Sequence, residues 1–138
     1  MEQENCVFCK IVSGEIPSST IYEDNDFKVI LDISPATKGH AIIIPKNHAK
    51  NVFELSEEDA SKVFVVAKKV ATAMKEALKC DGFNILQNNE EVAGQTVFHF
   101  HMHLIPRYKE DKVTIKWCDE HYVGEDIGII AEKIKKCL

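Results

Sequence analysis

The sequence has no long hydrophobic run, no excess of basic residues, and no internal repeat or low-complexity stretch. Its longest apolar segments, such as residues 63–67, are far shorter than the roughly 20 residues that a membrane-spanning helix needs. With 17 Lys and Arg against 22 Asp and Glu, the net charge is −5, which disfavours general nucleic-acid binding because that relies on many basic contacts to phosphates. We therefore expect neither a membrane nor a nucleic acid as partner. A small phosphorylated ligand stays compatible with this charge, because backbone amides can hold one.

Features of secretion and of disulfide frameworks are missing as well. Residues 1–5 are acidic and contain no apolar stretch, so we expect no secretory signal. Five cysteines are an odd number, which fits free thiols better than a disulfide framework. These features predict a cytoplasmic protein. The length fits one domain, residues 1–138, that is large enough to bury a core without disulfides.

The hydrophobic pattern predicts five strands and one long helix. Runs of β-branched and aromatic residues between turn-forming residues predict strands at residues 20–23, 27–32, 41–44, 83–87 and 98–105. The order of strands, helix and strands favours an α+β domain, with a mostly antiparallel sheet and the long helix on one face.

The long helix is expected to begin after Ser56, a good N-cap, and to end at Asp81-Gly82. Its apolar residues recur at helical spacing: Ala60, Val63, Phe64, Ala67, Val70, Ala71, Met74 and Leu78. Shorter helices are predicted at about residues 6–13 and 128–136.

Three histidines alternate in the last predicted strand, at positions 99, 101 and 103. Alternate side chains of a strand share a face, so His99, His101 and His103 should lie together. The opposite face should pack against the helix through Phe98, Phe100, Met102 and Leu104. One residue type repeated on one face has no packing rationale. Two alternatives remain at this point: a polar face that happens to be histidine-rich, and a metal site, because a strand His-x-His can place two ligands on one ion.

The loop before this strand contains Asn88 and the run Gly94-Gln95-Thr96-Val97. Glycine lets the backbone come close to a ligand, and successive N–H groups in such a turn can bind an anion. Glycine with polar residues describes most loops. Beside three histidines, however, this loop suggests phosphate chemistry.

Cys6 and Cys9 form a C-x-x-C pair. This spacing suits one edge of a tetrahedral zinc site but supplies only half of the ligands. A redox pair usually follows a strand and opens a helix, whereas no strand is predicted before Cys6.

Taken together, these motifs resemble the histidine triad (HIT) family. Residues 99–105 match its His-x-His-x-His pattern, and residues 94–97 resemble its phosphate loop. Residues 32–35, 39–40 and 44–48 resemble its nucleotide-binding half, and residues 8–11 and 14–17 resemble its usual opening. The likeness covers about residues 5–107, and the tail at 108–138 departs from it. It is strongest to the small Hint-like nucleotide-binding branch, especially the bacterial type with a cysteine pair.

The resemblance implies a HIT-like fold: a mostly antiparallel five-stranded sheet, one long helix and short terminal helices. It also implies an enzyme that binds purine nucleoside monophosphates and cleaves nucleoside phosphoramidates or related nucleotidyl substrates. His101 would be the nucleophile and form a covalent nucleotidyl-histidine, since a neutral imidazole is a good nucleophile near pH 7. Two alternatives are a dinucleoside polyphosphate hydrolase and a nucleotide-sensing or scaffold protein with incidental turnover.

The resemblance assigns further roles, residue by residue. His103 would contact phosphate oxygens or the leaving group, and His40 would support the triad. Asp32 would take both ribose hydroxyls, although an aspartate here also suits a turn cap. The phosphate would be held by Asn88, Gly94, Gln95, Thr96 and Val97. The base would lie among Val7, Phe8, Ile11, Ile30 and Ile33, which alone would read as ordinary core.

In relatives with the cysteine pair, two histidines complete a zinc site. They correspond here to His48 and His99, so the resemblance implies structural zinc on Cys6, Cys9, His48 and His99. It also implies a homodimer.

Overall fold

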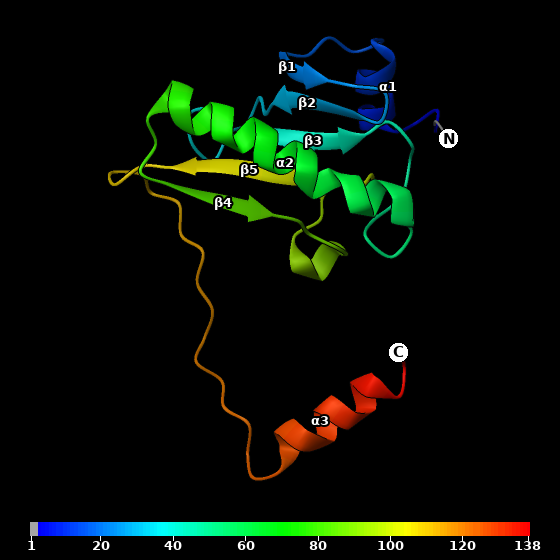
Figure 1. Ribbon diagram of the computed structural model, residues 1–138, viewed down its shortest axis with the longest axis vertical. Coiled ribbons are helices and arrows are strands. Elements are labelled where there is room, and N and C mark those ends of the chain that lie inside the picture. Colours follow the sequence, from blue (N-terminus) through cyan, green and yellow to red (C-terminus); the bar gives the residue numbers. More distant parts are fainter. Residues whose placement is uncertain (1–2) are drawn as a thin grey trace.

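The computed structural model describes residues 3–138 and contains a single five-stranded sheet (Figure 1). The strand order is β1-β2-β3-β5-β4, and every neighbouring pair is antiparallel. The strands are β1 (Thr20–Glu23), β2 (Phe27–Leu31), β3 (Ala41–Pro45), β4 (Gly82–Leu86) and β5 (Met102–Arg107). The helices are α1 (Val7–Ser13), α2 (Glu57–Leu78), α3 (Asp126–Lys135) and the short 3-10 helix η1 (Glu91–Ala93). The predicted α+β fold is confirmed.

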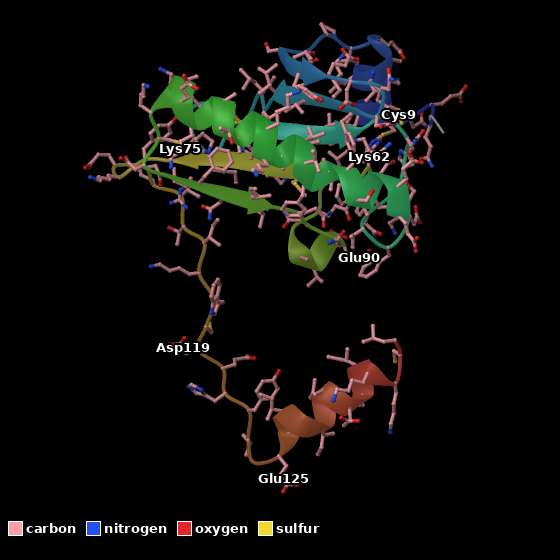
Figure 2. All side chains as sticks on the ribbon, viewed as in Figure 1. Cys9, Lys62, Lys75, Glu90, Asp119 and Glu125 are labelled. Carbon is pink, nitrogen blue, oxygen red and sulfur yellow. The ribbon has the colours of Figure 1, made fainter. Side chains whose placement is uncertain are left out.

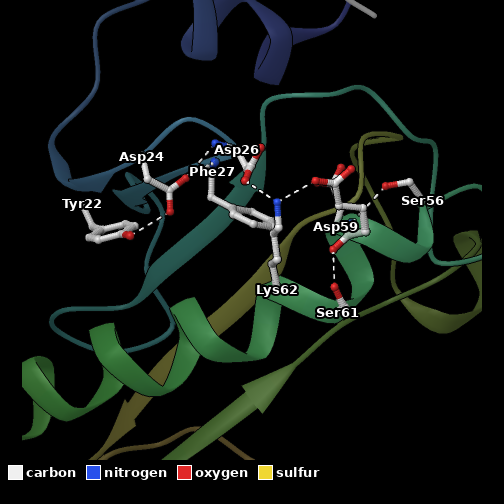
Figure 3. Close-up of polar contacts among 9 residues, drawn as sticks. Tyr22, Asp24, Asp26, Phe27, Ser56, Asp59, Ser61 and Lys62 are labelled. Atoms are coloured by element: carbon white, nitrogen blue, oxygen red, sulfur yellow. Dashed lines mark hydrogen bonds and ion pairs between the residues drawn. The ribbon is translucent and has the colours of Figure 1, made fainter.

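Helix α2 lies across one face of the sheet (Figure 1). Its predicted N-cap is confirmed, because Ser56 Oγ accepts the N–H of Asp59 at 3.0 Å (Figure 3). Lys62 Nζ then ties the helix to the β1–β2 turn through Asp26 at 3.0 Å. The prediction that Asp81-Gly82 ends the helix is wrong. Lys79 ends it in the left-handed conformation, with φ of 53°, and Gly82 begins β4.

The main core lies between α2 and the sheet. Its buried members are Phe27, Val29, Ala41, Ile43, Val63, Val66, Ala67, Val70, Met74, Phe100, Met102 and Leu104. The apolar stripe expected on α2 is wider than this core, because Ala60 and Phe64 are exposed. One flank of the helix therefore carries apolar residues that the described residues of this chain do not cover.

Strand β5 differs most from its prediction. It begins at Met102 instead of Phe98, because the N–H of Phe100 bonds the carbonyl of Ala49 and draws this segment out of the ladder. Phe98 is exposed, not packed against α2 as expected. The strand also continues through Pro106, where the sequence predicted its end. The carbonyl of Pro106 accepts the Thr37 hydroxyl at 2.6 Å, two residues beyond Leu104, which is the last residue of β5 that pairs with β3.

The chain leaves the sheet after Arg107, whose guanidinium is held by Asp111 at 2.8 Å. Residues 114–138 are exposed throughout, and α3 stands apart from the sheet on the side of β4 (Figures 1 and 2). This helix begins two residues before its predicted start at 128. Among residues 3–138, none of the helices has the length and apolar character needed to cross a membrane.

The cap of α2 gives a test of this fold. We expect Ser56→Ala to lower the free energy of unfolding by about 1 kcal/mol, because it removes the acceptor for a helix N–H that has no other partner within the helix. Urea denaturation measures the change. Ser61→Ala is the matched control, since the Ser61 hydroxyl only donates to the carbonyl of Glu58 on an exposed turn. Equal losses in both variants would contradict the assignment of Ser56 as the cap.

Candidate active site

A cleft of about 450 Å³ lies on the face of the sheet opposite α2. The structure brings ten of the predicted site residues to its walls: Val7, Phe8, Ile11, Ile30, Asp32, Ile33, Thr96, Val97, His101 and His103. Sequence reasoning missed six others: Ile16, Pro17, Ser18, Leu31, Ser34 and Ile42. Their residue types carry no signal for a cleft, because apolar and small residues fit a core or a turn equally well.

The position of one proton makes His101 a potential nucleophile. Its Nδ1 lies 2.7 Å from the carbonyl oxygen of His99. A carbonyl can only accept, so Nδ1 carries the proton and Nε2 keeps its lone pair. Burial lowers the pKa of His101, which keeps the ring neutral at neutral pH. The ring of Phe8 meets it edge-on, with centroids 4.9 Å apart. A fixed neutral imidazole with a free lone pair is suited to attack on an electrophile.

His103 is held in the opposite tautomer by a chain of hydrogen bonds. The backbone N–H of Ala36 donates to His40 Nδ1 at 2.9 Å, so the proton of His40 is on Nε2. His40 Nε2 then donates to His103 Nδ1 at 2.9 Å, and His103 carries its own proton on Nε2. Burial is the main cause that lowers the pKa of His103 to about 4. At neutral pH His103 is thus an uncharged hydrogen-bond donor.

Asp32 follows β2 and caps a turn, which is one of the two roles that its position suggested. Its Oδ1 accepts the N–H of Ser34 at 2.8 Å and caps the turn. Its Oδ2 lies 3.8 Å from His40 Nε2, and the residue lines the cleft. One carboxylate oxygen is therefore committed to the turn, while the carboxylate as a whole borders the histidines.

The loop at residues 88–97 is shaped by Gln95, which is 2% exposed. Its side chain accepts the N–H of Glu90 and donates to the carbonyls of Lys50 and Val97. Gly94 has φ of +96°, and a Cβ there would approach the Asn88 amide nitrogen to 3.3 Å. Of the five residues predicted to hold phosphate, Thr96 and Val97 line the cleft, whereas the other three shape this loop. Those three are Asn88, Gly94 and Gln95.

A second cluster joins the two cysteines to two histidines. The donor atoms of Cys6, Cys9, His48 and His99 all lie within 4.8 Å of one another. His99 Nε2 donates to the carbonyl of Pro45 at 2.8 Å, so its Nδ1 lone pair points into the cluster. Two thiols and two imidazoles at these positions fit a tetrahedral metal ion such as zinc. The prediction that these four residues come together is matched by this geometry.

Asp32, His40 and His103 form another group with donor atoms within 4.8 Å. This group does not fit a metal ion. The Ala36 N–H fixes the proton of His40 on Nε2, which is the atom that a shared ion would need. Of the two groups, only the cysteine–histidine cluster has its lone pairs directed to a common centre.

Comparisons with known proteins agree with this arrangement. A family model described as the HIT domain matches residues 13–110. The protein named hit from Bacillus subtilis is 46% identical over 138 residues, which cover 98% of this chain and 95% of the relative. An adenosine 5′-monophosphoramidase from Schizosaccharomyces pombe is 38% identical over 131 residues, covering 94% of this chain and 96% of the relative.

Solved structures show the same fold. A HIT family protein from Bacillus subtilis superposes with a TM-score of 0.92 at 46% identity, and the match covers 98% of both chains. A zinc-bound histidine triad family protein from Mycobacterium smegmatis gives a TM-score of 0.76 at 42% identity and covers 84% of both chains.

The low pKa of His103 predicts a dependence of stability on pH. The unfolded residue has a pKa of 6.5 and the folded one about 4, so the unfolded state binds more protons between these values. The free energy of unfolding should therefore fall as pH drops from about 6.5 to 4. The titratable groups facing His103 are His40, Asp32 and His101, and they remain when His103 alone is replaced. The test therefore compares wild type with His103→Asn. Urea denaturation at several pH values should show a shallower slope in the variant. His121→Asn, on the exposed tail, should keep the wild-type slope, and an unchanged slope in His103→Asn would contradict the assignment.

Proposed function

Since this chain belongs to the histidine triad (HIT) family of nucleotide-binding hydrolases, we propose that it cleaves purine nucleoside phosphoramidates or related nucleotidyl substrates. The reaction would pass through a covalent nucleotidyl intermediate on His101. The observation that carries this proposal is the hydrogen bond from His101 Nδ1 to the carbonyl of His99. This hydrogen bond leaves the Nε2 lone pair free in the cleft. The substrate class is supported by the adenosine 5′-monophosphoramidase among the relatives. We place the reaction in the cytoplasm, as the sequence predicts.

The walls of the cleft suit the three parts of a nucleotide. The purine lies against the apolar side chains of α1 and β2, chiefly Phe8, Ile11 and Ile30. The ribose hydroxyls donate hydrogen bonds to Asp32, because a carboxylate offers acceptors for a vicinal diol. The α-phosphate then lies between Thr96 and His101. The base, the ribose and the phosphate of the substrate thus lie in this order along the cleft.

The chemistry needs two displacements at the α-phosphorus. His101 Nε2 attacks phosphorus and the P–N bond breaks, so the leaving amine departs and takes a proton from solvent. The His99 carbonyl accepts the Nδ1–H of His101 and stabilises the positive charge that forms on the ring. His103, neutral at this pH, donates its Nε2–H to a phosphate oxygen. Water then attacks the same phosphorus and loses a proton to solvent, and the bond between phosphorus and His101 Nε2 breaks, which releases the nucleoside monophosphate and restores His101.

We also propose that zinc occupies the cluster of Cys6, Cys9, His48 and His99. The directed Nδ1 lone pair of His99 and the two adjacent sulfur atoms support this choice. When bound, the ion supplies a structural cross-link between the N-terminal segment and the strand end that carries the triad. His99 then takes no part in proton transfer.

Finally, we propose a homodimer formed along α2 and the edge strand β4. The flank of α2 next to β1 borders a groove, where Lys69, Ala73 and Ala77 face Tyr22. Phe64 lies on the other flank, toward β4, and is 60% exposed. Strand β4 has no partner on its outer side among the described residues.

The same edge carries further apolar surface. Ile85 of β4 is 42% exposed on the side of α2. The tail also leaves the sheet here, and α3 buries none of its residues within the described chain. Its isoleucines at 127, 130 and 134 share one face of that helix. A second copy of this chain, placed across β4, covers these surfaces together.

The nucleophile can be tested by replacing it. We expect His101→Ala to lower hydrolysis of adenosine 5′-phosphoramidate by at least about a thousandfold, because the attacking lone pair is lost. Intact mass spectrometry after brief mixing should show one nucleotidyl adduct on wild type and none on the variant. The same substitution at exposed His121 is the control and should keep both adduct and rate. Full turnover by His101→Ala would overturn the mechanism, whereas tight AMP binding without turnover in wild type would favour the nucleotide-sensing alternative.

The dimer can be tested by charging its expected interface. We expect Phe64→Glu to weaken association by roughly tenfold or more, because a carboxylate is buried against the second copy. Light scattering across a concentration series measures the mass. Val65→Glu is the matched control, since Val65 is the next residue and faces solvent on the outer side of α2. A wild-type protein that stays monomeric, or equal effects of both variants, would contradict this interface.

A further inference from the structure

We infer that Cys6 and Cys9 are an oxidisable pair, and that joining them as a disulfide weakens nucleotide binding in the neighbouring cleft. The inference rests on the proposed function for its second half, since it assumes that the cleft holds a nucleotide. Its first half is a modification site that stands on the geometry of the two sulfur atoms alone.

The two sulfur atoms lie close enough for side-chain rotation to bring them together. Cys6 is the N-cap of α1 and Cys9 lies in the first turn, so the N–H of Cys9 donates to Cys6 Sγ at 3.3 Å. The two Sγ atoms lie within 4.8 Å of each other. Residues three apart in a helical turn are neighbours, and a disulfide needs Cα atoms about 4.4–6.8 Å apart. Bond formation thus requires side-chain rotation and little movement of the helix.

Unequal exposure sets the order of events. Cys6 is partly exposed, whereas Cys9 is 3% exposed. The Cys6 thiolate therefore attacks hydrogen peroxide, breaks its O–O bond and becomes a sulfenic acid, with release of hydroxide. The Cys9 thiolate then attacks the sulfur of Cys6 and displaces a second hydroxide. The two sulfur atoms lose two electrons to the peroxide, and two protons from solvent convert the hydroxides to water. The disulfide would leave only His48 and His99 of the cluster to hold a metal ion.

Helix α1 connects this pair to the cleft. Phe8 lies between the two cysteines in sequence, and its ring contacts His101 and His99 with centroids 4.9 Å and 5.9 Å apart. Ile11 of the same helix packs with Ile30 in the apolar wall of the cleft. A helix of seven residues is too short to be stable by itself, so its position depends on these anchors.

His99 gives a second connection. Its Nδ1 contacts Cys6 Sγ at 3.3 Å and Cys9 Sγ at 3.5 Å, while its carbonyl accepts the Nδ1–H of His101. Loss of the cluster removes the contacts of the His99 ring with both sulfur atoms, and the backbone that holds the nucleophile loses one of its restraints. The pair is therefore coupled to both the base wall and the catalytic histidine.

The experiment uses the full chain loaded with zinc and carrying Cys118→Ser and Cys137→Ser, which remove the exposed thiols of the tail. Peroxide treatment is followed by zinc release to a chelating dye, peptide mapping of the disulfide, and calorimetric affinity for AMP. We expect a Cys6–Cys9 disulfide, loss of zinc, and a Kd for AMP raised roughly tenfold or more as an apolar wall is lost. Dithiothreitol with zinc should restore the affinity. The NMR signals of ¹⁵N-labelled histidine should change at the ring of His101.

Cys80→Ser is the matched control in the same background, because Cys80 is buried outside the cluster, and it should keep the whole response. Cys9→Ser should form no disulfide. Thiols at 6 and 9 that stay unlinked after peroxide would overturn the modification site. A disulfide with zinc loss but unchanged AMP affinity and unchanged His101 signals would overturn the coupling. If the reduced protein neither binds AMP nor turns over a phosphoramidate, the proposed function fails, and the His101 signals still decide the coupling.

Discussion

The backbone and side chain of His99 form the constraint on which both candidate sites depend. Its Nε2–H donates to the carbonyl of Pro45, its Nδ1 faces the two cysteines, and its own carbonyl holds the proton of His101. Each of these contacts fixes one tautomer. If the His99 ring were reversed, the Nδ1 lone pair would leave the cluster. If its carbonyl moved, His101 would be free to place its proton on the attacking nitrogen.

The fold was predicted well where local rules decide the structure. Alternating apolar residues and the cap at Ser56 placed the strands and α2, because pattern and capping act within a few residues. The start of β5 was wrong because a distant group decides it. The N–H of Phe100 bonds Ala49, more than 50 positions earlier, and no pattern in residues 98–101 reveals that contact. The same contact exposes Phe98, which the strand alternation had placed in the core.

The candidate site was predictable in its chemistry and less so in its walls. The spacing of the histidines and of the cysteine pair singled these residues out, and the resemblance to the HIT family supplied the roles expected of them. The apolar lining was different, since Ile30 and Ile33 look alike in the sequence. Ile30 is 5% exposed beneath the cleft and Ile33 is 98% exposed at its rim. They differ because Ile30 lies inside β2, paired with Ile42, whereas Ile33 lies beyond the end of that strand.

Backbone groups decide which of two similar clusters suits a metal ion. His40 and His99 each lie beside another histidine and an acidic or thiol group, so the side chains alone make both clusters look like metal sites. A carbonyl at Pro45 forces the proton of His99 away from its cluster, and an N–H at Ala36 forces the proton of His40 toward its own. The first arrangement presents a lone pair and the second a hydrogen-bond donor. The direction of these backbone groups in the fold therefore makes the cysteine–histidine cluster suited to a metal ion and makes the His40–His103 pair a hydrogen-bond donor.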